Sequence, residues 1–344
     1  MLDQAKGRIL IAGGAGFIGS NLSKRKLEEG HQVDCLDNLS TGRLDQLAPL
    51  RGFDNFNFIH GDVVDPRVCR KLSGRNYTEI YHLACPTGVP NLAILGEEML
   101  LACSVGTRHL LRLAEESGAR FLFASSSEAY GDPQVFPQSE AYCGNVDPVG
   151  RRSPYEEGKR FGEALTAYYS RAKKIDARIV RIFNCYGPNM SMDDRRVIPQ
   201  MLGRMIEAKR AVIYGDGGQT RTFLHVDDLL SGFALIMRKG AAGEVYNLGS
   251  DRETTILELF EAARAVTGST AAPLFKPHFI ADHQRRRPDV SRVARLGWKQ
   301  RIALREGLAR SFQDLLAASG RASRPGRASG EPLRLSAAKE DMRA

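Results

Sequence analysis

Short apolar runs alternate with longer stretches of mixed polarity through the first half of the chain. Short continuous apolar runs are typical of strands buried on both faces of a parallel sheet, and the stretches between them are compatible with helices. This alternation predicts an α/β fold of the Rossmann type, a doubly wound parallel sheet with helices on both faces. The expected strands are 9–12, 33–37, 56–60, 80–84, 121–125 and 177–183, and the main expected helices are 17–29, 95–117 and 155–173.

The rhythm of the pattern changes after Pro188. Further helices are expected at 197–208, 226–238 and 255–267, strands at 211–214 and 245–248, and a basic loop at 283–288. We predict a nucleotide-binding domain over residues 1–188, to which some later segments return, and a smaller C-terminal α/β substrate lobe over 189–316. Residues 317–344 are rich in Ala, Ser, Gly, Arg and Pro, which predicts a disordered basic tail.

Composition narrows the function classes. Hydrophobic residues make up 42% and charged residues 26% of the 344 residues, as in ordinary globular domains. Without an apolar run of about 18 residues or a signal peptide, the chain is predicted to be cytoplasmic with no membrane partner. The six cysteines form no C-x-x-C pair or cysteine–histidine cluster, so no metal is expected. The net charge of +9 suits phosphate-bearing substrates; basic residues are not interleaved with aromatic ones, so no nucleic-acid partner is expected.

A glycine cluster lies between the first expected strand and the first expected helix. Its members are Gly13, Gly14, Gly16 and Gly19. Glycines allow a sharp turn, and the helix N-terminus offers free N–H groups and a positive dipole end to a pyrophosphate. Asp37 ends the second strand about 20 residues farther on, where a carboxylate bonds ribose hydroxyls and favours NAD over NADP. Asp62, after the third strand, is a candidate for the adenine amino group. The alternatives are a merely structural turn and, because Arg43 is near, a 2′-phosphate.

Tyr155 and Lys159 are four residues apart in an expected helix, so their side chains share one face. An ammonium beside the phenol, together with a positive nicotinamide ring, favours the phenolate and lowers its pKa. The pair could then take a proton from a sugar hydroxyl while hydride leaves the same carbon. Tyr-x-x-x-Lys alone also occurs by chance in helices, and only the glycine cluster upstream gives it weight.

The fifth expected strand ends in Ser125-Ser126-Ser127-Glu128. Ligands of such sheets bind beyond the carboxyl ends of the strands, so these side chains are candidates for catalysis. Ser126 could share a hydrogen bond with the substrate hydroxyl that Tyr155 deprotonates. The alternative is a serine-rich turn that caps the next segment, with Glu128 a solvated acid.

Two further segments carry arginines. A glycine-rich segment over 215–228 contains Arg221, which could clamp a diphosphate bidentately. The run Arg285-Arg286-Arg287 precedes Pro288 and could line a pocket for an anionic substrate. The alternatives are a plain turn for the first segment and a solvated charged face for the second.

These segments together resemble the extended short-chain dehydrogenase/reductase family of nucleotide-sugar enzymes, in particular the UDP-glucuronate decarboxylases, or UDP-xylose synthases. The resemblance covers residues 8–312. The forms Y-E-E-G-K-R at 155–160 and S-E-A-Y-G-D at 127–132 are more specific than the family-wide Tyr-x-x-x-Lys. Other similar stretches lie at 81–86, 144–150, 181–184 and 285–289.

The resemblance implies a reaction and its residues. Tyr155, tuned by Lys159 and helped by Ser126, removes the O4 proton of a UDP-linked sugar while NAD takes the C4 hydride. The resulting β-keto acid loses carbon dioxide, and the hydride returns to C4, so NAD is recycled. Ser127, Glu128 and Arg286 complete the implied catalytic set.

The resemblance also implies binding residues and an assembly. The implied cofactor residues are Gly13, Gly16, Phe17, Ile18, Gly19, Asp37, Asn38, Ser40, Thr41, Gly42, Arg43, Asp62, Val63, Leu83 and Ala84, with Tyr155 and Lys159. The implied substrate residues are Pro86, Asn184, Arg196, Tyr214, Arg221 and Arg286. Family members commonly pair through two helices per subunit, so a homodimer through 95–117 and 155–173 is expected.

The substrate loop departs from the family pattern. Leu92 and Ile94 stand where the family has tyrosines, and Leu101 and Cys103 replace a lysine and an asparagine. A site that lacks hydrogen-bonding groups usually rejects the substrate that needs them, so a different or modified sugar nucleotide stays open. A 4-epimerase is the alternative reaction, but it needs no glutamate at 128; a 4,6-dehydratase usually has Asp-Glu at 127–128. A non-catalytic NAD-binding protein is the alternative of another class.

Overall fold

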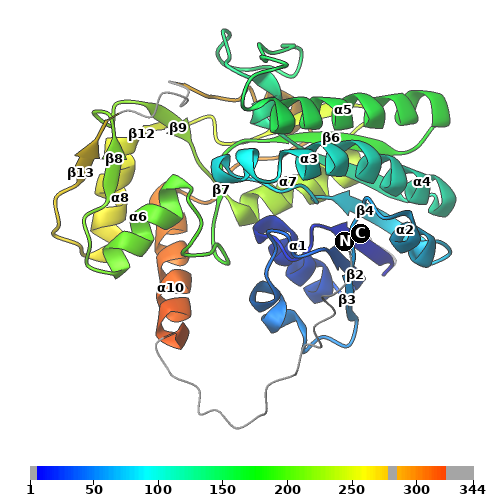
Figure 1. The fold of residues 1–344 in the computed structure, drawn as a ribbon, viewed down its shortest axis with the longest axis horizontal. Helices are drawn as coiled ribbons and strands as arrows, with labels where there is room; N and C mark the ends of the chain where they lie inside the picture. Colours follow the sequence, from blue (N-terminus) through cyan, green and yellow to red (C-terminus); the bar gives the residue numbers. More distant parts are fainter. Residues whose placement is uncertain (1–5, 278–284, 323–344) are drawn as a thin grey trace, which may run out of the picture.

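A seven-stranded parallel sheet forms the centre of the protein (Figure 1). The computed structural model describes residues 6–277 and 285–322. The strand order is β11-β6-β5-β4-β1-β2-β3, which is doubly wound because the chain moves outward from β1 in both directions. The predicted fold class is therefore confirmed. The strands are Arg8–Ala12 (β1), Gln32–Asp37 (β2), Phe56–His60 (β3), Tyr77–His82 (β4), Arg120–Ser126 (β5), Ala177–Ile182 (β6) and Val245–Leu248 (β11).

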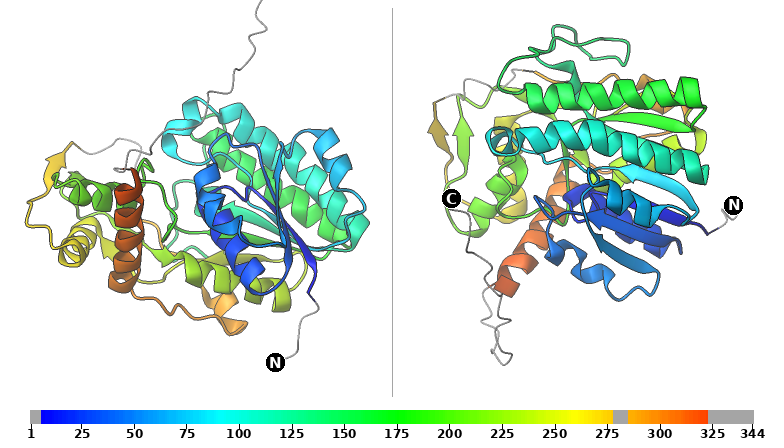
Figure 2. Two further views of the ribbon diagram at one scale, coloured as in Figure 1. Left: turned by 90° about the horizontal axis from the view of Figure 1, so that it is seen from below. Right: turned by 45° about the vertical axis from the view of Figure 1, so that its right-hand side comes forward.

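Helices cover both faces of this sheet (Figure 2). Successive side chains of a strand point to opposite faces, so Ile9 and Ile11 of β1 belong to one hydrophobic cluster and Leu10 and Ala12 to the other. Phe17–Glu28 (α1) and Val226–Lys239 (α7) pack on the first face. Pro66–Leu72 (α2), Thr107–Ser117 (α4) and Ser153–Lys173 (α5) pack on the second.

The segment expected as one helix over 95–117 contains a change of helical pitch. It comprises Gly96–Leu101 (α3), a π-helical turn at Ala102–Gly106 (η3) and α4. The π turn packs against α5. Inserted π turns often accompany functional sites, and this one adjoins the helix that carries Tyr155 and Lys159.

The C-terminal lobe has its own hydrophobic core. Val197–Ile206 (α6), Ile256–Thr267 (α8) and Leu304–Ala322 (α10) surround buried side chains such as Leu202, Phe260 and Leu308. Two small sheets complete it: Val212–Tyr214 (β8) with Leu274–Lys276 (β13), and Thr220–Thr222 (β9) with Glu253–Thr255 (β12). The remaining elements are Leu44–Leu50 (η1), Val89–Ala93 (η2), Ser127–Tyr130 (η4), Cys185–Tyr186 (β7), Leu224–His225 (β10) and Ser291–Arg295 (α9).

Two sequence expectations for this half need comment. The prediction of disorder from residue 317 is wrong for 317–322, because α10 continues through these residues. The helix is anchored just before them by the buried side chain of Leu315. Residues 323–344 and His283 of the expected basic loop lie outside the described residues. The segments α7 and β11 leave the lobe and join the central sheet. In the part of the chain that the structure describes, we find no helix with the length and apolarity to cross a bilayer.

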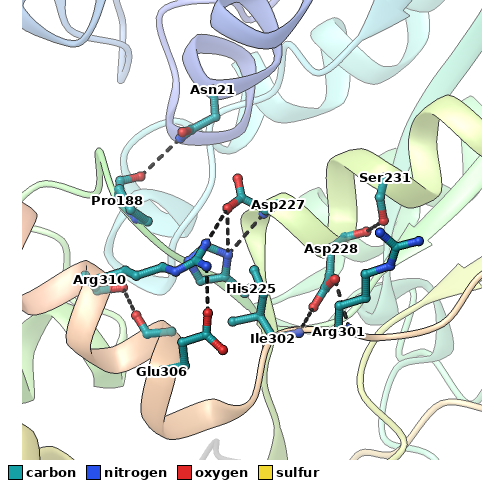
Figure 3. A network of polar contacts seen from close by, with 12 residues as sticks. Asn21, Pro188, His225, Asp227, Asp228, Ser231, Arg301, Ile302, Glu306 and Arg310 are labelled. Carbon is teal, nitrogen blue, oxygen red and sulfur yellow. Dashed lines mark hydrogen bonds and ion pairs between the residues drawn. The ribbon is translucent and has the colours of Figure 1, made fainter.

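Two adjacent aspartates join α7 to the chain near α10 (Figure 3). Asp228 is 2% exposed, and its carboxylate accepts hydrogen bonds from the backbone N–H groups of Arg301 at 3.1 Å and Ile302 at 2.9 Å. Asp227 has a half-exposed side chain and forms an ion pair of 3.0 Å with Arg310. Asp227 and Asp228 are therefore adjacent in the sequence, but only the carboxylate of Asp228 is buried.

We expect Asp228→Ala to lower the free energy of unfolding by about 3 kcal/mol, because two backbone donors lose a charged acceptor. Asp227→Ala is the matched control and should cost less than about 1 kcal/mol, as exposed ion pairs contribute little. Urea unfolding followed by circular dichroism measures both values. Equal losses of unfolding free energy in the two variants would contradict the stabilising role of the contact between Asp228 and the backbone of Arg301 and Ile302.

Candidate active site

The predicted site segments gather at one edge of the central sheet. All strands are parallel, so their carboxyl ends meet at the same edge. The strand order reverses between β1 and β4, and open α/β sheets bind their ligands at the carboxyl end of such a reversal. In spatial order the segments at this edge are Asn184 after β6, Ser126–Glu128 at the end of β5, 83–86 after β4, 13–19 after β1, 37–43 at the end of β2, and 62–63 after β3.

The glycine turn leaves room at the N-terminus of α1. Gly13 has φ +80°, and a Cβ on it would lie 2.6 Å from the backbone nitrogen of Ala84. A Cβ on Gly19 would overlap the carbonyl of Gly13. A Cβ on Gly16 would approach only the Gly13 carbonyl, at 3.4 Å, so it would otherwise project into open space in front of the helix. No side chain of the described residues caps this N-terminus. The turn therefore fits a pyrophosphate, which would take the free N–H groups and the positive dipole end of α1.

Asp37 is fixed beside this turn. Its two carboxylate oxygens accept hydrogen bonds from the backbone N–H groups of Ala15, at 2.9 Å, and Leu39, at 2.8 Å. Burial raises the pKa of Asp37, while these two hydrogen bonds lower it. Arg43 pairs with Asp45 and donates to the Ser191 hydroxyl at 2.8 Å. The structure therefore fixes a carboxylate at the end of β2, beside the glycine turn, and gives the nearby arginine other partners.

The loops around Asp37 include the other adenosine-side candidates. Asp62 accepts hydrogen bonds from the Asn38 amide and from the backbone N–H of Val64, both at 2.8 Å. Gly42 packs so closely that a Cβ there would lie 2.7 Å from an oxygen of Asp37. Ser40 and Thr41 are exposed on the same loop. The loop after β2, with Asn38, and the loop after β3, with Asp62, are therefore in direct contact.

Tyr155 and Lys159 lie one turn apart on α5, as predicted. Lys159 is 4% exposed; its ammonium donates to the carbonyl of Ala124 at 2.8 Å and lies 5.7 Å from the centre of the Tyr155 ring. Tyr155 is half-buried, and its hydroxyl is near enough to Ser126 and Lys159 for both to affect its pKa. Burial raises the pKa of Tyr155 to about 12, against the lowering effects of Lys159 and Ser126. The phenol is therefore neutral here, and a further positive charge is needed to ionise it near neutral pH.

Glu128 is held between two arginines. Arg286, from the segment before Pro288, and Arg152, just before α5, each bond one of its carboxylate oxygens. Although burial raises the pKa of Glu128, the two arginines hold it at about 2, so the group is ionised at neutral pH. Arg286 is buried and also donates to the carbonyl of Gly131 at 3.2 Å and to the hydroxyl of Ser127 at 3.4 Å.

Arg152 was missed by the sequence reasoning. It bonds both Glu128 and Glu156, the latter at 3.0 Å and four residues along the helix. The i,i+4 pairing of opposite charges was the available signal. It indicates a surface ion pair and does not by itself point to Glu128.

The predicted substrate residues are more dispersed. Arg196 lies against the glycine turn, with its guanidinium 5.3 Å from the centre of the Phe17 ring, and pairs with Asp194. Asn184 donates to the carbonyl of Thr222 at 3.1 Å, and Arg221 on β9 donates to that of Thr220 at 2.8 Å. The others are Pro86, which is buried after β4, and Tyr214, which is exposed on β8.

The divergent loop residues also separate. Ile94 is 75% exposed, whereas Leu92 and Leu101 are half-buried. Cys103 is fully buried in the π turn. The structure therefore brings only part of this set toward the interior.

Most of the chain is similar to known nucleotide-sugar enzymes. Residues 9–249 match the NAD dependent epimerase/dehydratase family. The chain is 41% identical over 308 residues to UDP-glucuronic acid decarboxylase 1 of Arabidopsis thaliana. The matched region covers 89% of this chain and 69% of that relative. UDP-glucose 4-epimerase of Thermotoga maritima, solved with UDP-glucose, has a TM-score of 0.83 at 28% identity, covering 91% of this chain and 99% of that one. dTDP-glucose 4,6-dehydratase of Streptomyces venezuelae, solved with NAD, has a TM-score of 0.81 at 28% identity, covering 91% and 98%.

Proposed function

The chain belongs to the NAD-dependent epimerase/dehydratase family, and on that premise we propose that it decarboxylates a nucleoside-diphosphate uronic acid, converting UDP-glucuronate to UDP-xylose with NAD as a recycled cofactor. The observation that carries the proposal is the ionised Glu128 between Arg152 and Arg286, next to Tyr155 and Lys159. Reversible oxidation at C4 requires the tyrosine–lysine pair. Chemistry at C5 requires in addition charged groups such as those around Glu128.

NAD, when bound at the glycine turn, supplies a hydride acceptor and donor for C4 of the sugar. Gly13, Gly16 and the N-terminus of α1 would hold its pyrophosphate, and Asp37 its adenosine ribose. Tyr155 takes the proton from O4 while Ser126 orients the same hydroxyl. Lys159 favours the phenolate through its positive charge.

The sugar becomes a β-keto acid once C4 is a ketone. The bond between C5 and its carboxylate carbon breaks, carbon dioxide leaves, and the electron pair moves into a C4 enolate. The phenol of Tyr155, which now carries the proton, donates a hydrogen bond to this enolate oxygen. Glu128, fixed by its two arginines, positions the sugar ring at C5. C5 then takes a proton from solvent, and C4 is reduced again as the hydride returns to it and Tyr155 gives its proton back to O4.

Epimerisation at C4 is the alternative outcome of the same oxidation. It requires the tyrosine and lysine but no carboxylate held by two arginines. Glu128 therefore favours decarboxylation. The apolar residues Leu92 and Leu101 of the substrate loop keep open a sugar other than glucuronate, because they cannot form the family's polar contacts.

The protein should convert UDP-glucuronate, in the presence of catalytic NAD, to a product lighter by the mass of carbon dioxide. Liquid chromatography with mass detection distinguishes this from a product of unchanged mass and altered retention, the result for an epimerase. Tyr155→Phe should lower kcat by about 10³-fold and leave NAD binding intact, because it removes the proton acceptor alone. A Tyr155→Phe variant with the wild-type rate would rule out this mechanism.

Glu128→Gln should lower kcat for carbon dioxide release by about 10²-fold, with NAD affinity unchanged. Glu253→Gln is the matched control, because Glu253 also has a pKa of about 2 and lies between two arginines, Arg285 and Arg287. It should retain kcat within about twofold. If Glu128→Gln and Glu253→Gln reduce kcat and NAD affinity alike, the role of Glu128 is structural.

We also propose a homodimer formed through α5 and the adjoining α3. Phe161 and Tyr168, each 54% exposed, lie seven residues apart on one face of α5, and Leu100 of α3 is 41% exposed. Figure 2 shows α5 and the α3–α4 segment side by side on the outside of the sheet. Exposed apolar side chains along neighbouring helices are typical of an interface between subunits.

The double variant Phe161→Glu/Tyr168→Glu should halve the mass measured by light scattering after size exclusion, because two charges would be buried in the interface. Phe275→Glu, at a residue 52% exposed on β13, is the control and should leave the mass unchanged. A wild-type protein with the mass of one chain would contradict the dimer.

A further inference from the structure

Two free cysteines lie side by side behind the catalytic edge. The sulfur of Cys103 is 3.6 Å from that of Cys85 and donates a hydrogen bond to it. Cys85 follows β4 and is half-buried, and Cys103 lies in the π turn between α3 and α4 and is fully buried. Among the described residues, the other four cysteines (Cys35, Cys69, Cys143 and Cys185) form no hydrogen bond with another cysteine.

This pair adjoins the proposed catalytic residues. A Cβ on Gly158, which directly precedes Lys159, would lie 3.6 Å from the Cβ of Cys103. The two sulfurs raise the pKa of Lys159 against the opposing effect of burial. The hydrogen bond that Cys103 shares with Cys85, helped by the charge of Lys159 and opposed by burial, lowers the pKa of Cys103 to about 7. The hydrogen bond with Cys103 and burial raise the pKa of Cys85, so the thiolate of the pair, the reactive form of cysteine, belongs to Cys103.

Closing a disulfide requires the two sulfurs to come closer than they are in this structure. A disulfide has a sulfur–sulfur distance of about 2.05 Å, so the sulfurs have to move together by about 1.5 Å. Cys85 lies in a loop and Cys103 in the π turn, so neither is in a strand or a regular α-helical turn. We propose that Cys85 and Cys103 form a redox-active dithiol, a modification site that a hydroperoxide closes to a disulfide and that lowers turnover when closed.

The chemistry balances with a hydroperoxide as the oxidant. With hydrogen peroxide, one thiolate of the pair attacks a peroxide oxygen, the O–O bond breaks, and a sulfenic acid and hydroxide form; the hydroxide takes up the proton that this thiol released on ionising. The second sulfur attacks the first, the S–O bond breaks, and water leaves as the disulfide forms. Two electrons pass from the two sulfurs to the peroxide, and the two thiol protons end in the two water molecules.

Closure affects the catalytic edge through contact. Cys85 directly precedes Pro86, a proposed substrate residue, and Cys103 packs against α5 between Tyr155 and Lys159. A displacement of about 1 Å in a catalytic group can cost about 10²-fold in rate. We expect kcat to fall at least tenfold on closure and to recover on reduction.

Peptide mapping tests the disulfide without any activity measurement. No Lys or Arg lies between the two cysteines, so trypsin leaves both on one peptide, whereas Glu97 and Glu98 allow a glutamate-specific protease to separate them. After mild treatment with hydrogen peroxide and alkylation of the remaining thiols, the protein should give peptides 80–98 and 99–115 joined by a reducible bond. Cys85→Ser and Cys103→Ser should lose this species, and Cys143→Ser, at an exposed cysteine, should keep it. Oxidation of the exposed Cys143 shows that the peroxide has reacted with the protein. If Cys85 and Cys103 are both still alkylated under these conditions, the proposal is overturned.

The second test measures kcat for decarboxylation, so it rests on the proposed function. The kcat of the peroxide-treated wild type should fall at least tenfold and return with dithiothreitol. Cys85→Ser and Cys103→Ser, each compared with its own untreated sample, should lose less than twofold. A mapped disulfide with an unchanged rate would overturn the claimed effect on turnover. If the reduced protein shows no decarboxylation, the proposed function fails, while the peptide mapping still decides the dithiol.

Discussion

Lys159 places a positive charge inside the protein, and much of the surrounding structure compensates for it. The ammonium is almost fully buried, which opposes its charge, yet its pKa is raised above the ordinary value. The carbonyl of Ala124 accepts a hydrogen bond from the ammonium at 2.8 Å, and the ammonium lies 5.3 Å from the centre of the Phe123 ring. A buried charge is tolerated only with such hydrogen bonds and opposite charges around it.

This charge belongs to a larger polar network at the end of β5. Glu163, one turn farther along α5, contributes negative charge near Lys159 and accepts a hydrogen bond from Ser125 at 2.5 Å. Arg181 of β6 then pairs with Glu163 at 2.7 Å. The strand end that carries Ser126 is therefore tied to α5 at Lys159 and again one turn farther along, at Glu163. A rigid support of this kind holds catalytic groups in a fixed geometry.

The contact between Glu128 and Arg286 joins the two parts of the molecule. Arg286 lies in the C-terminal half of the chain, just before α9, and its bond to Glu128 brings that segment to the sheet edge. Arg285 and Arg287, on either side, pair with Glu253 of β12. One short basic segment therefore links the lobe to the end of β5, which explains why its arginines do not form a simple solvated face.

Local patterns in the sequence were sufficient for the central sheet. Apolar runs gave the strands to within a few residues, because burial on both faces requires continuous hydrophobicity. The same patterns missed the π turn at Ala102–Gly106 and the helical continuation of α10 through 317–322. A π turn leaves the apolar periodicity of the flanking helices almost unchanged, and α10 is held by packing against α8 and α6 in addition to its own composition.

The sequence by itself determined the glycine turn, the acid at the end of β2 and the shared face of Tyr155 and Lys159. Each of these depends on spacing within a strand or a few helical turns, where backbone geometry dictates which side chains meet. Only the tertiary structure decided that Arg152 and Arg286 share Glu128, and that Cys85 meets Cys103 across 18 residues. Such pairs come from separate elements, and the packing of the whole chain is what brings their side chains within bonding distance.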